Sequence, residues 1–124
     1  MSKKKILVID DDEALRDAYD LALSEDYEVI AAVDGIDGVE KYTQTTPHMV
    51  FLDLRMPRMD GIGVLKHIRQ NDKATPVYIV TAFAKEYMDE LVKVREEGTT
   101  FEVASKPLGS QQILTIARSI LSDN

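Results

Sequence analysis

The 124-residue chain contains no cysteine, no long apolar run and fewer basic than acidic residues, and each deficit excludes a class of protein. Without cysteine there is no disulfide, no thiolate metal site and no cysteine nucleophile. The apolar stretches are only a few residues long, so we expect no signal peptide and no membrane-spanning helix, and we predict a cytoplasmic protein. The net charge is −7, which disfavours a nucleic-acid backbone as a direct partner.

The remaining composition is ordinary for a soluble globular protein. Hydrophobic residues make up 44% of the chain and charged residues 30%. A chain of 124 residues is long enough for one domain with one hydrophobic core. We therefore predict a single domain over residues 1–124.

Five short segments have the composition of β-strands. Residues 6–9, 49–52 and 77–80 are continuous apolar runs, which predict strands buried on both faces. Residues 27–33 and 101–104 contain polar positions, which favours places at the edges of the sheet. The three continuous apolar runs therefore belong in the centre of the sheet.

Segments whose apolar residues have helical spacing lie between these strands. The first helix follows the capping residue Asp12, and Asp60 is a suitable N-cap for the third. A long fourth helix is expected from about residue 85 to 97, with Gly98 as its stop. The apolar positions that define the first, fourth and last helices are Leu15, Ala18, Tyr19 and Ala22; Met88, Leu91 and Val92, with Arg95; and Ile113, Ile116, Ala117 and Ile120.

Alternating strands and helices predict a parallel sheet covered by helices on both faces. With right-handed crossovers, the strand order 2-1-3-4-5 puts the apolar strands in the centre and the polar strands at the edges. The predicted fold class is therefore α/β, with a doubly wound five-stranded sheet.

Polar residues follow four of the predicted strands. Asp10 and Asp11 follow the first, Asp53 the third, Thr81 the fourth and Lys106 the fifth. Ligands of such sheets bind outside the carboxyl ends of the strands, so these side chains are expected to converge. Taken singly, Asp53 could be a strand cap, Thr81 a strand-ending β-branched residue and Lys106 a solvated charge. Taken together, they favour a site.

The residue types suggest phosphoryl chemistry. Crowded carboxylates repel one another unless a cation is present, and an open all-oxygen site suits Mg²⁺. Asp53 could then act as a nucleophile that forms an aspartyl phosphate. Lys106 could pair with the phosphoryl group, and the hydroxyl of Thr81 could donate a hydrogen bond to it.

Four segments carry a family resemblance: I-L-V-I-D-D-D-E at 6–13, F-L-D-L-R-M-P-R-M-D-G at 51–61, V-T-A-F at 80–83 and S-K-P-L at 105–108. They resemble the receiver domain of two-component response regulators, in particular single-domain regulators of the chemotaxis type. The resemblance covers essentially the whole chain and implies a flavodoxin-like fold.

The resemblance also implies roles for the acidic residues. Asp53 matches the phosphoacceptor, and Asp10 and Asp11 match the acidic pair that holds Mg²⁺ together with Asp53 and the backbone carbonyl of Arg55. A third acid, Asp12, makes the metal pair ambiguous from the residues alone. The family register leaves Asp12 as the helix cap.

The remaining roles concern signalling. The resemblance implies that Thr81 is the switch hydroxyl and that Lys106, before a usually cis bond to Pro107, binds the phosphoryl group. The donor would be a phosphohistidine on a sensor histidine kinase or a histidine phosphotransfer protein, and the domain itself would promote the transfer. The fourth helix, fifth strand and fifth helix would form the face that switches and binds a downstream protein, or a weak dimer partner.

Two other functions were weighed against this interpretation. An aspartate-nucleophile phosphohydrolase also places an aspartate after a strand, but it carries an acid two residues later, where this chain has Arg55. A pseudo-receiver would bind protein without phosphorylation, but the acidic pair, Thr81 and Lys106 argue against it. Whether the chain is a stand-alone regulator or part of a longer protein stays open.

The chain departs from the family pattern between Thr81 and Lys106, where it is a few residues longer. Val103 occupies the position that usually bears the switch aromatic, and Phe101, two residues earlier, is a candidate substitute. The departures concern how phosphorylation is relayed.

Two bulky residues are expected beside the phosphorylation site. Arg55 and Phe83 lie two residues beyond Asp53 and Thr81, where side chains in this family overhang the phosphoryl group. We predict that this pair hinders the attacking water and gives a relatively long-lived phosphate.

Overall fold

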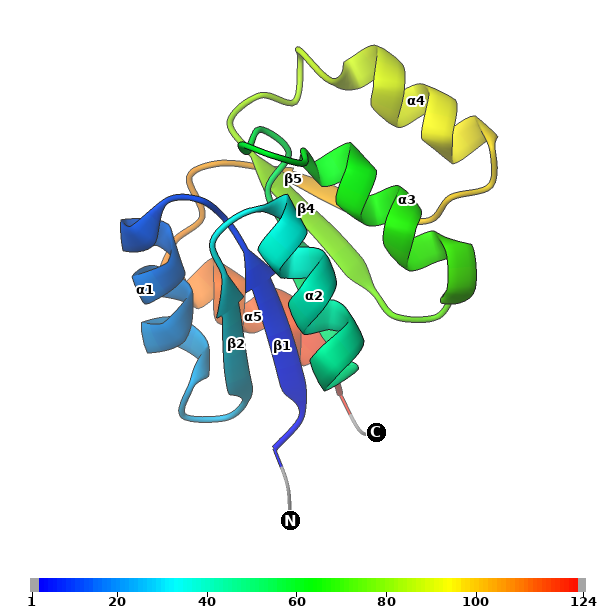
Figure 1. Ribbon diagram of the computed structural model, residues 1–124. Coiled ribbons are helices and arrows are strands. Elements are labelled where there is room, and N and C mark those ends of the chain that lie inside the picture. The colour runs from blue at the N-terminus through cyan, green and yellow to red at the C-terminus, as the bar shows by residue number, and fades with distance from the viewer. Residues whose placement is uncertain (1–2, 123–124) are drawn as a thin grey trace.

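The computed structural model describes residues 3–122 as five strands that alternate with five helices (Figure 1). The strands are β1 (Lys5–Ile9), β2 (Glu28–Ala32), β3 (Met49–Leu52), β4 (Val77–Thr81) and β5 (Glu102–Ser105). The helices are α1 (Glu13–Leu23), α2 (Gly35–Thr45), α3 (Gly61–Asn71), α4 (Met88–Glu96) and α5 (Ser110–Ile120). All strand pairs are parallel and their order is β2-β1-β3-β4-β5, which confirms the predicted topology.

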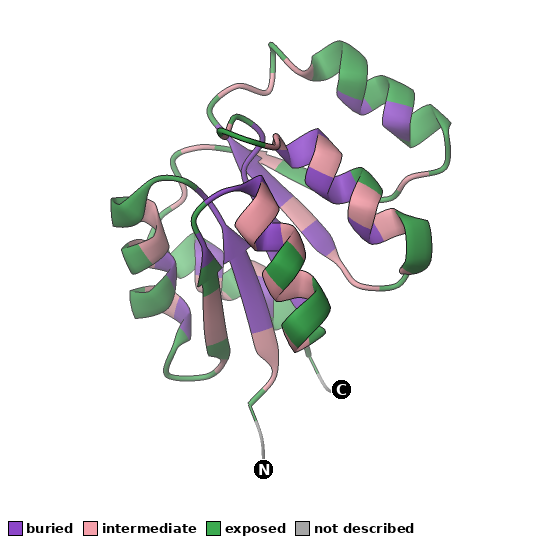
Figure 2. Ribbon diagram, in the orientation of Figure 1, coloured by how far each residue is buried: buried purple, intermediate pink, exposed green. Residues whose placement is uncertain are grey.

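The central strands separate two apolar layers. In β1, Ile6 and Val8 point into a cluster with residues of α1 and α5, whereas Leu7 and Ile9 point into a cluster with residues of α2, α3 and α4. Successive side chains of a strand face opposite ways, so a continuous apolar run fills both layers. Figure 2 shows β1 and β4 largely buried and β2 mostly half-buried or exposed, and β5 is also largely exposed, which confirms the two edge strands.

Aspartate side chains begin three of the helices. Asp12 accepts hydrogen bonds from the backbone N–H groups of Ala14 and Leu15, as the predicted cap of α1. Asp34 and Asp60 cap α2 and α3 in the same way. Each carboxylate satisfies backbone donors that the first helical turn leaves unpaired and lies at the positive end of the helix dipole.

The fourth helix differs from its prediction. It has nine residues, against eleven for each of the other four, so the extra length between Thr81 and Lys106 lies in the connections rather than in a long helix. It begins at Met88 instead of residue 85, because the preceding segment forms turns and offers no capping side chain. It ends at Glu96, one residue before the predicted end, and the chain turns at Gly98, whose φ of 92° is the left-handed conformation that glycine adopts without strain.

The buried side of α4 also differs from the one expected. Leu91 and Val94 face the core, whereas Met88 and Val92 are about half exposed. The segment before β5 explains the difference, because Phe101 enters the same core cluster and packs against α4 from the Leu91 and Val94 side. Met88 and Val92, the apolar residues of α4 outside this cluster, therefore remain on the surface.

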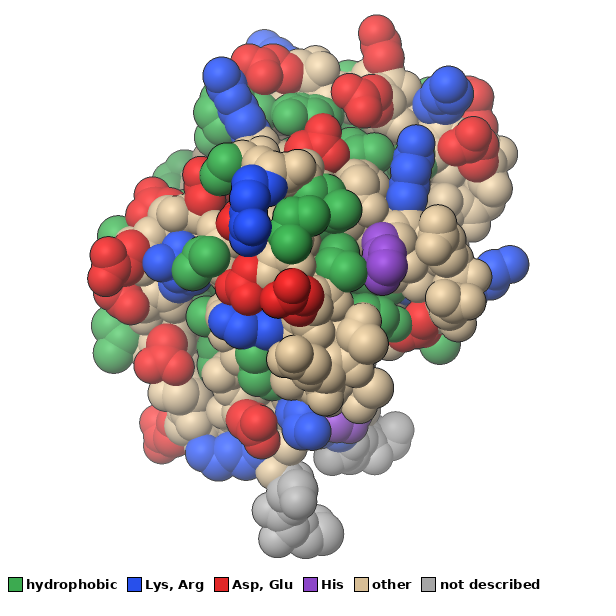
Figure 3. Space-filling view, viewed as in Figure 1, with side chains coloured by type: hydrophobic (Ala, Val, Ile, Leu, Met, Phe, Trp, Pro, Cys, Tyr) green, Lys and Arg blue, Asp and Glu red, His purple; other side chains and the backbone are tan. Residues whose placement is uncertain are grey.

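Strand boundaries shift by at most one residue from those predicted. β2 is one residue shorter at each end, and β5 begins and ends one residue later than expected. Acidic and basic side chains are interspersed over the face that carries α2, α3 and α4 (Figure 3). Within residues 3–122, no helix has both the length and the apolar character needed to cross a membrane.

Candidate phosphorylation site

The carboxyl ends of β1 and β3 bring two aspartates together. The strands are paired in register from Ile6 to Ile9, and the backbone N–H of Asp53 continues the ladder by donating to the carbonyl of Ile9 at 3.0 Å. Asp10 and Asp53 are 2% and 4% exposed, and Asp11 is exposed beside them. One carboxylate oxygen from each of the three lies within 4.8 Å of the others.

Lys106 reaches this cluster from the end of β5. Its Nζ lies 3.1 Å from Oδ2 of Asp10 and 3.2 Å from Oδ2 of Asp53, so one ammonium bridges the two buried carboxylates. The backbone places it there, because the N–H of Lys106 donates to the carbonyl of Thr81 at 2.9 Å. The following bond to Pro107 is cis, as the resemblance implies.

Burial and charge act on these groups in opposite directions. Burial raises the pKa of Asp53, and the carboxylate of Asp10 raises it further, while Lys106 lowers it; the pKa stays above its usual range. Burial alone would lower the pKa of Lys106, but the carboxylates of Asp10 and Asp53 outweigh it and the pKa is raised. Lys106 is thus firmly protonated, and three carboxylates face a single ammonium.

Thr81 ends β4 and is fully buried. Its hydroxyl oxygen accepts a hydrogen bond from the backbone N–H of Phe83 at 2.9 Å, so it is held in the turn that follows the strand. Thr81 pairs with Ser105 in the sheet, one residue before Lys106. The fourth and fifth strands therefore deliver their polar residues to the same edge as β1 and β3.

Such a donor set suits a hard divalent cation. The ligand atoms that the three aspartates offer are all carboxylate oxygens, the type that Mg²⁺ prefers, and the exposed Asp11 leaves the cluster open to water. The negative charge that Lys106 leaves uncompensated is a further reason for a cation to bind there.

Comparison with known proteins identifies the chain. The family model of the response regulator receiver domain matches residues 6–118. The chain belongs to this family. Chemotaxis protein CheY of Treponema pallidum is 39% identical over 121 residues, which cover 94% of this chain and 82% of that protein. Response regulator MprA of Mycobacterium sp. (strain KMS) is 31% identical, and this chain spans only about half of its length.

Solved structures agree with the receiver fold. The response regulator protein TrrA from Thermotoga maritima, in complex with Mg²⁺ and BeF, is 26% identical with a TM-score of 0.80, over 95% of this chain and 99% of that chain. Chemotaxis protein CheY4 of Vibrio cholerae is 24% identical with a TM-score of 0.83, over 97% and 100% of the two chains, and this likeness concerns the fold.

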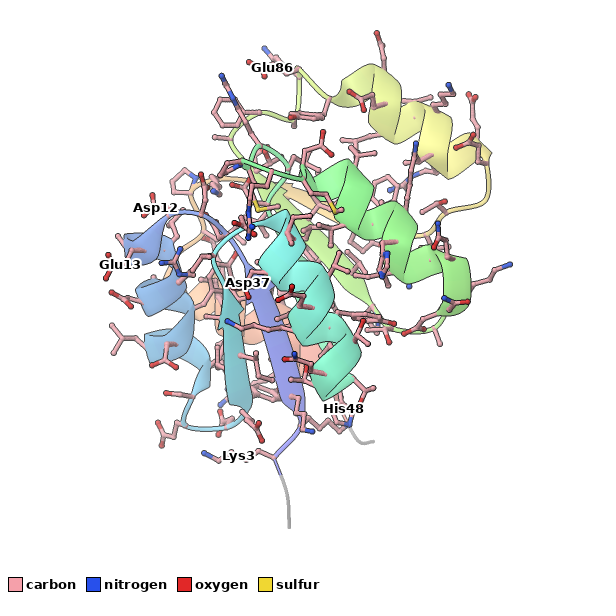
Figure 4. The ribbon with its side chains drawn as sticks, in the orientation of Figure 1. Lys3, Asp12, Glu13, Asp37, His48 and Glu86 are labelled. Atoms are coloured by element: carbon pink, nitrogen blue, oxygen red, sulfur yellow. The ribbon has the colours of Figure 1, made fainter. Side chains whose placement is uncertain are left out.

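Exposed Arg55 and half-buried Phe83 meet beside the site. The guanidinium carbon of Arg55 lies 4.7 Å from the ring centroid of Phe83, within the range of a cation–π contact. An ion pair of 3.7 Å also joins Arg55 to Glu86, which Figure 4 shows on the connection between β4 and α4. The two residues predicted to overhang the phosphoryl group are thus stacked on each other.

Phe101 and Val103 lie on the output side of this receiver. Phe101 is buried, with the guanidinium carbon of Arg95 at 4.3 Å from its ring centroid. Val103 is 37% exposed and pairs with Ile79, two positions before Thr81. Phe101 precedes β5 and lies still further from Thr81, so the structure places it as a core residue and not near the hydroxyl of Thr81.

Other contacts of the site were not anticipated from the sequence. The guanidinium of Arg16 donates to the carbonyl of Asp10 at 2.8 Å and so ties α1 to the end of β1. Asp34, at the start of α2, forms a two-pronged ion pair with Arg58 in the β3–α3 loop. His48 lies at the opposite end of the sheet from Asp12, away from this chemistry (Figure 4).

Proposed function

We propose that this receiver accepts a phosphoryl group on Asp53 from a phosphohistidine of a sensor histidine kinase or a histidine phosphotransfer protein. The observation that carries the proposal is the position of the Asp53 carboxylate. It is buried, yet it lies at the end of β3 beside the carboxylate of Asp10, and the ammonium of Lys106 pairs with both. A buried charge in such a place is costly unless its chemistry is used.

The proposed transfer forms one bond and breaks one. An oxygen of Asp53 bonds to phosphorus as the phosphorus–nitrogen bond of the phosphohistidine breaks. The imidazole, protonated on its other ring nitrogen, leaves with the electron pair of that bond and is then neutral. Lys106 is close enough to Asp53 to pair with the transferred group and stabilise its charge. The same domain would promote both its own phosphorylation and the later hydrolysis.

We propose that Asp10, Asp11 and Asp53, with the backbone carbonyl of Arg55, hold Mg²⁺. Bound Mg²⁺ would offset the negative charge of the carboxylates and orient the phosphoryl oxygens. The clustering of the three carboxylates supports this assignment, as does the Mg²⁺ complex of the structurally similar TrrA.

We propose that Thr81 is the switch. Its hydroxyl, whose oxygen now accepts the N–H of Phe83, would move to donate its own hydrogen to a phosphoryl oxygen, which changes the turn that leads to α4. Next to that turn, α4 and β5 enclose an apolar groove of about 400 Å³ whose walls include the exposed side chains of Met88, Val92 and Val103. We propose that a downstream protein partner binds the face formed by α4, β5 and α5.

The remaining proposals concern setting and assembly. We propose that residues 1–124 form one receiver domain that acts in the cytoplasm, without direct contact to nucleic acid or membrane. A weak dimer through the α4–β5–α5 face is the other use of that surface. Light scattering before and after phosphorylation distinguishes dimerisation from the binding of another protein, because only dimerisation raises the mass of the protein on its own.

Intact-mass spectrometry after incubation with acetyl phosphate tests the phosphorylation. The wild type should gain one phosphoryl group with Mg²⁺ and none in EDTA, and D53N should gain none. D12N is the matched control, because Asp12 is an exposed neighbouring acid whose capping role asparagine preserves. An adduct that persists in D53N would refute the assignment.

The same experiment weighs the alternative functions. A folded wild type that gains no adduct and binds no Mg²⁺ would be a pseudo-receiver. Rapid turnover of acetyl phosphate, without an accumulating adduct, would instead indicate a phosphohydrolase. The arginine at position 55, in place of a second acid, is the reason that we rank the hydrolase lower.

A further inference from the structure

The β3–α3 loop contains a residue in an unfavourable backbone conformation. Arg58 has a φ of 70°, in the left-handed region that residues with a β-carbon rarely adopt unless they are asparagine or aspartate. Such a conformation persists only where surrounding contacts impose it. In this loop the contacts come from α2, which belongs to a different part of the chain.

The first contact is the ion pair between Arg58 and Asp34. Nε of Arg58 donates to Oδ2 of Asp34 at 2.8 Å, and Nη2 donates to Oδ1 at 3.0 Å. The Asp34 side chain is only 11% exposed and also accepts the N–H of Asp37 at 2.8 Å as the cap of α2. The helix cap therefore fixes the position of the Asp34 carboxylate, and the two parallel hydrogen bonds fix the guanidinium of Arg58 against it.

The second contact is a close approach between backbones. A β-carbon added to Gly35, the first residue of α2, would lie 2.0 Å from the carbonyl oxygen of Met59. The end of the loop therefore rests directly on the N-terminal turn of α2. Arg58 and Met59 together attach the loop to that turn, where Figure 3 shows basic and acidic side chains side by side.

The start of the loop is attached to the sheet. The N–H of Leu54 donates to Oδ1 of Asp53 at 2.8 Å, and the carbonyl of Leu54 accepts the N–H of Gly61 at 2.7 Å. Arg55 and Pro57, between the two attachments, are exposed. Between these ends Met56 packs against the core cluster, and the Arg55 side chain contacts Phe83 and Glu86. The backbone of the stretch is therefore held at Leu54, through these two side chains and at Arg58.

We propose that the Asp34–Arg58 ion pair holds the β3–α3 loop in the conformation that presents the Arg55 carbonyl to the divalent cation. Arg58 and Asp34 are then positioning residues for metal binding, although neither contacts the cluster of Asp10, Asp11 and Asp53. This inference rests on the proposed function. Without the ion pair, the loop would have to be ordered each time that the metal binds, which lowers the affinity.

The alternative is that the ion pair only stabilises the fold and does not affect metal binding. Titration of Mg²⁺ into phosphate-free protein by calorimetry separates the two, with R58N, D34N and the double variant. Asparagine at 58 tolerates the left-handed conformation, and asparagine at 34 can still cap α2, so both variants remove the ion pair and keep the backbone. R118N is the matched control, because it breaks the Arg118–Asp26 pair of 3.1 Å elsewhere on the surface.

We expect R58N and D34N each to weaken Mg²⁺ binding about three- to tenfold, and the double variant to bind as the single variants do, because each change breaks the same contact. The Mg²⁺ affinity of R58K should fall between those of R58N and the wild type, since lysine keeps the positive charge but cannot form two parallel hydrogen bonds to the carboxylate. The Mg²⁺ concentration for half-maximal phosphorylation should rise by the same factor, with the rate at saturating Mg²⁺ unchanged. R118N should match the wild type.

Affinities of R58N and D34N within twofold of the wild type would overturn the inference, even if the melting temperatures fall. If the loss of affinity in the double variant equals the product of the two single losses, the inference is also overturned, because the two residues would then act separately. If D34N does not fold, R58N and R58K decide alone. A wild type that binds no Mg²⁺ would refute the proposed metal site itself, which is a different result from normal binding in every variant.

Discussion

Replacing Lys106 by methionine should destabilise the metal-free protein by about 3 kcal/mol, a large part of the stability of a domain of this size. The ammonium lies 3.1 and 3.2 Å from the carboxylates of Asp10 and Asp53, both nearly inaccessible to solvent. At an effective dielectric constant of about 20, each attraction amounts to roughly 5 kcal/mol, most of which offsets the desolvation of the charges. Removing the cation leaves two buried carboxylates facing each other. We take the lower end of the range for a broken buried pair, because the Lys106 side chain is 17% exposed.

Urea unfolding in EDTA and in excess Mg²⁺ measures this effect. Methionine keeps an unbranched side chain that lacks only the terminal ammonium group, so the change is mainly electrostatic. In Mg²⁺ the deficit of K106M should shrink, because the cation neutralises the carboxylates that the ammonium no longer neutralises. The double variant K106M/D53N should recover much of the loss in EDTA, since only one of the two buried charges then remains.

K41M is the control for loss of a lysine ion pair. Lys41 lies 3.1 Å from Asp37 one turn away on α2 and also donates to the carbonyl of Ala31, and such pairs within a helix are worth about 0.5 kcal/mol. A loss in K106M no greater than that in K41M would refute the reasoning, because the carboxylates would then tolerate each other without a cation. An equal loss in EDTA and in Mg²⁺ would refute the role of the metal as the alternative neutralising charge.

Three further predictions follow from local contacts. Phe83→Ala should shorten the lifetime of the phosphoaspartate several-fold, because it breaks the stack with Arg55 that shields the site; an unchanged decay of the adduct mass would refute the shielding. Asp72→Asn should cost about 1 kcal/mol at neutral pH. Hydrogen bonds from two hydroxyl groups hold the pKa of Asp72 well below its usual range, so its contribution is present above the ordinary carboxyl pKa and is lost as the pH falls through the lowered value. Unfolding across pH checks this, and a deficit that persists in strong acid would contradict it. Gly61→Ala should lower the melting temperature sharply, because the added carbon would lie 2.2 Å from the carbonyl oxygen of Asp53; a melting temperature like that of the wild type would show that the loop yields.

Strand positions and the convergence of the site could be predicted because both follow from short-range patterns. A four- or five-residue apolar run can be buried on both faces only in the middle of a sheet, and residues 6–9, 49–52 and 77–80 have no other good place. Once the order of the strands is known, the residue that follows each strand must lie at one edge. The distances of Lys106 to Asp10 and Asp53 could not be foreseen, but their proximity could.

The orientation of α4 could not be predicted, because its sequence fits two faces. Met88, Leu91 and Val92 have helical spacing, and so do Leu91 and Val94. The choice is made by Phe101, which reaches the core from outside the helix and packs with Leu91 and Val94. A periodic pattern identifies a helix but not which neighbour arrives from a distant part of the chain.

The ion pair between Asp34 and Arg58 was missed for a similar reason. The residues are 24 positions apart, and each has a sufficient local explanation, as a helix cap and as an exposed loop residue. The left-handed backbone at Arg58 has no sequence signal either, because arginine is not a residue that favours it. Loops that are shaped by contacts with other elements, rather than by their own turn residues, are not encoded locally.

The two halves of the site rest on parts of the fold that are packed to different degrees. Asp10 and Asp53 follow β1 and β3, whose apolar residues are buried on both faces. Lys106 follows β5, an edge strand with exposed side chains, and Thr81 leads into a turn and then into α4, where Met88 and Val92 are about half exposed. A change of charge at the site therefore meets the least resistance on the side of α4 and β5, because few buried contacts have to be broken there. That difference in packing, and not the groove alone, is the physical reason to place the output surface on this side of the sheet.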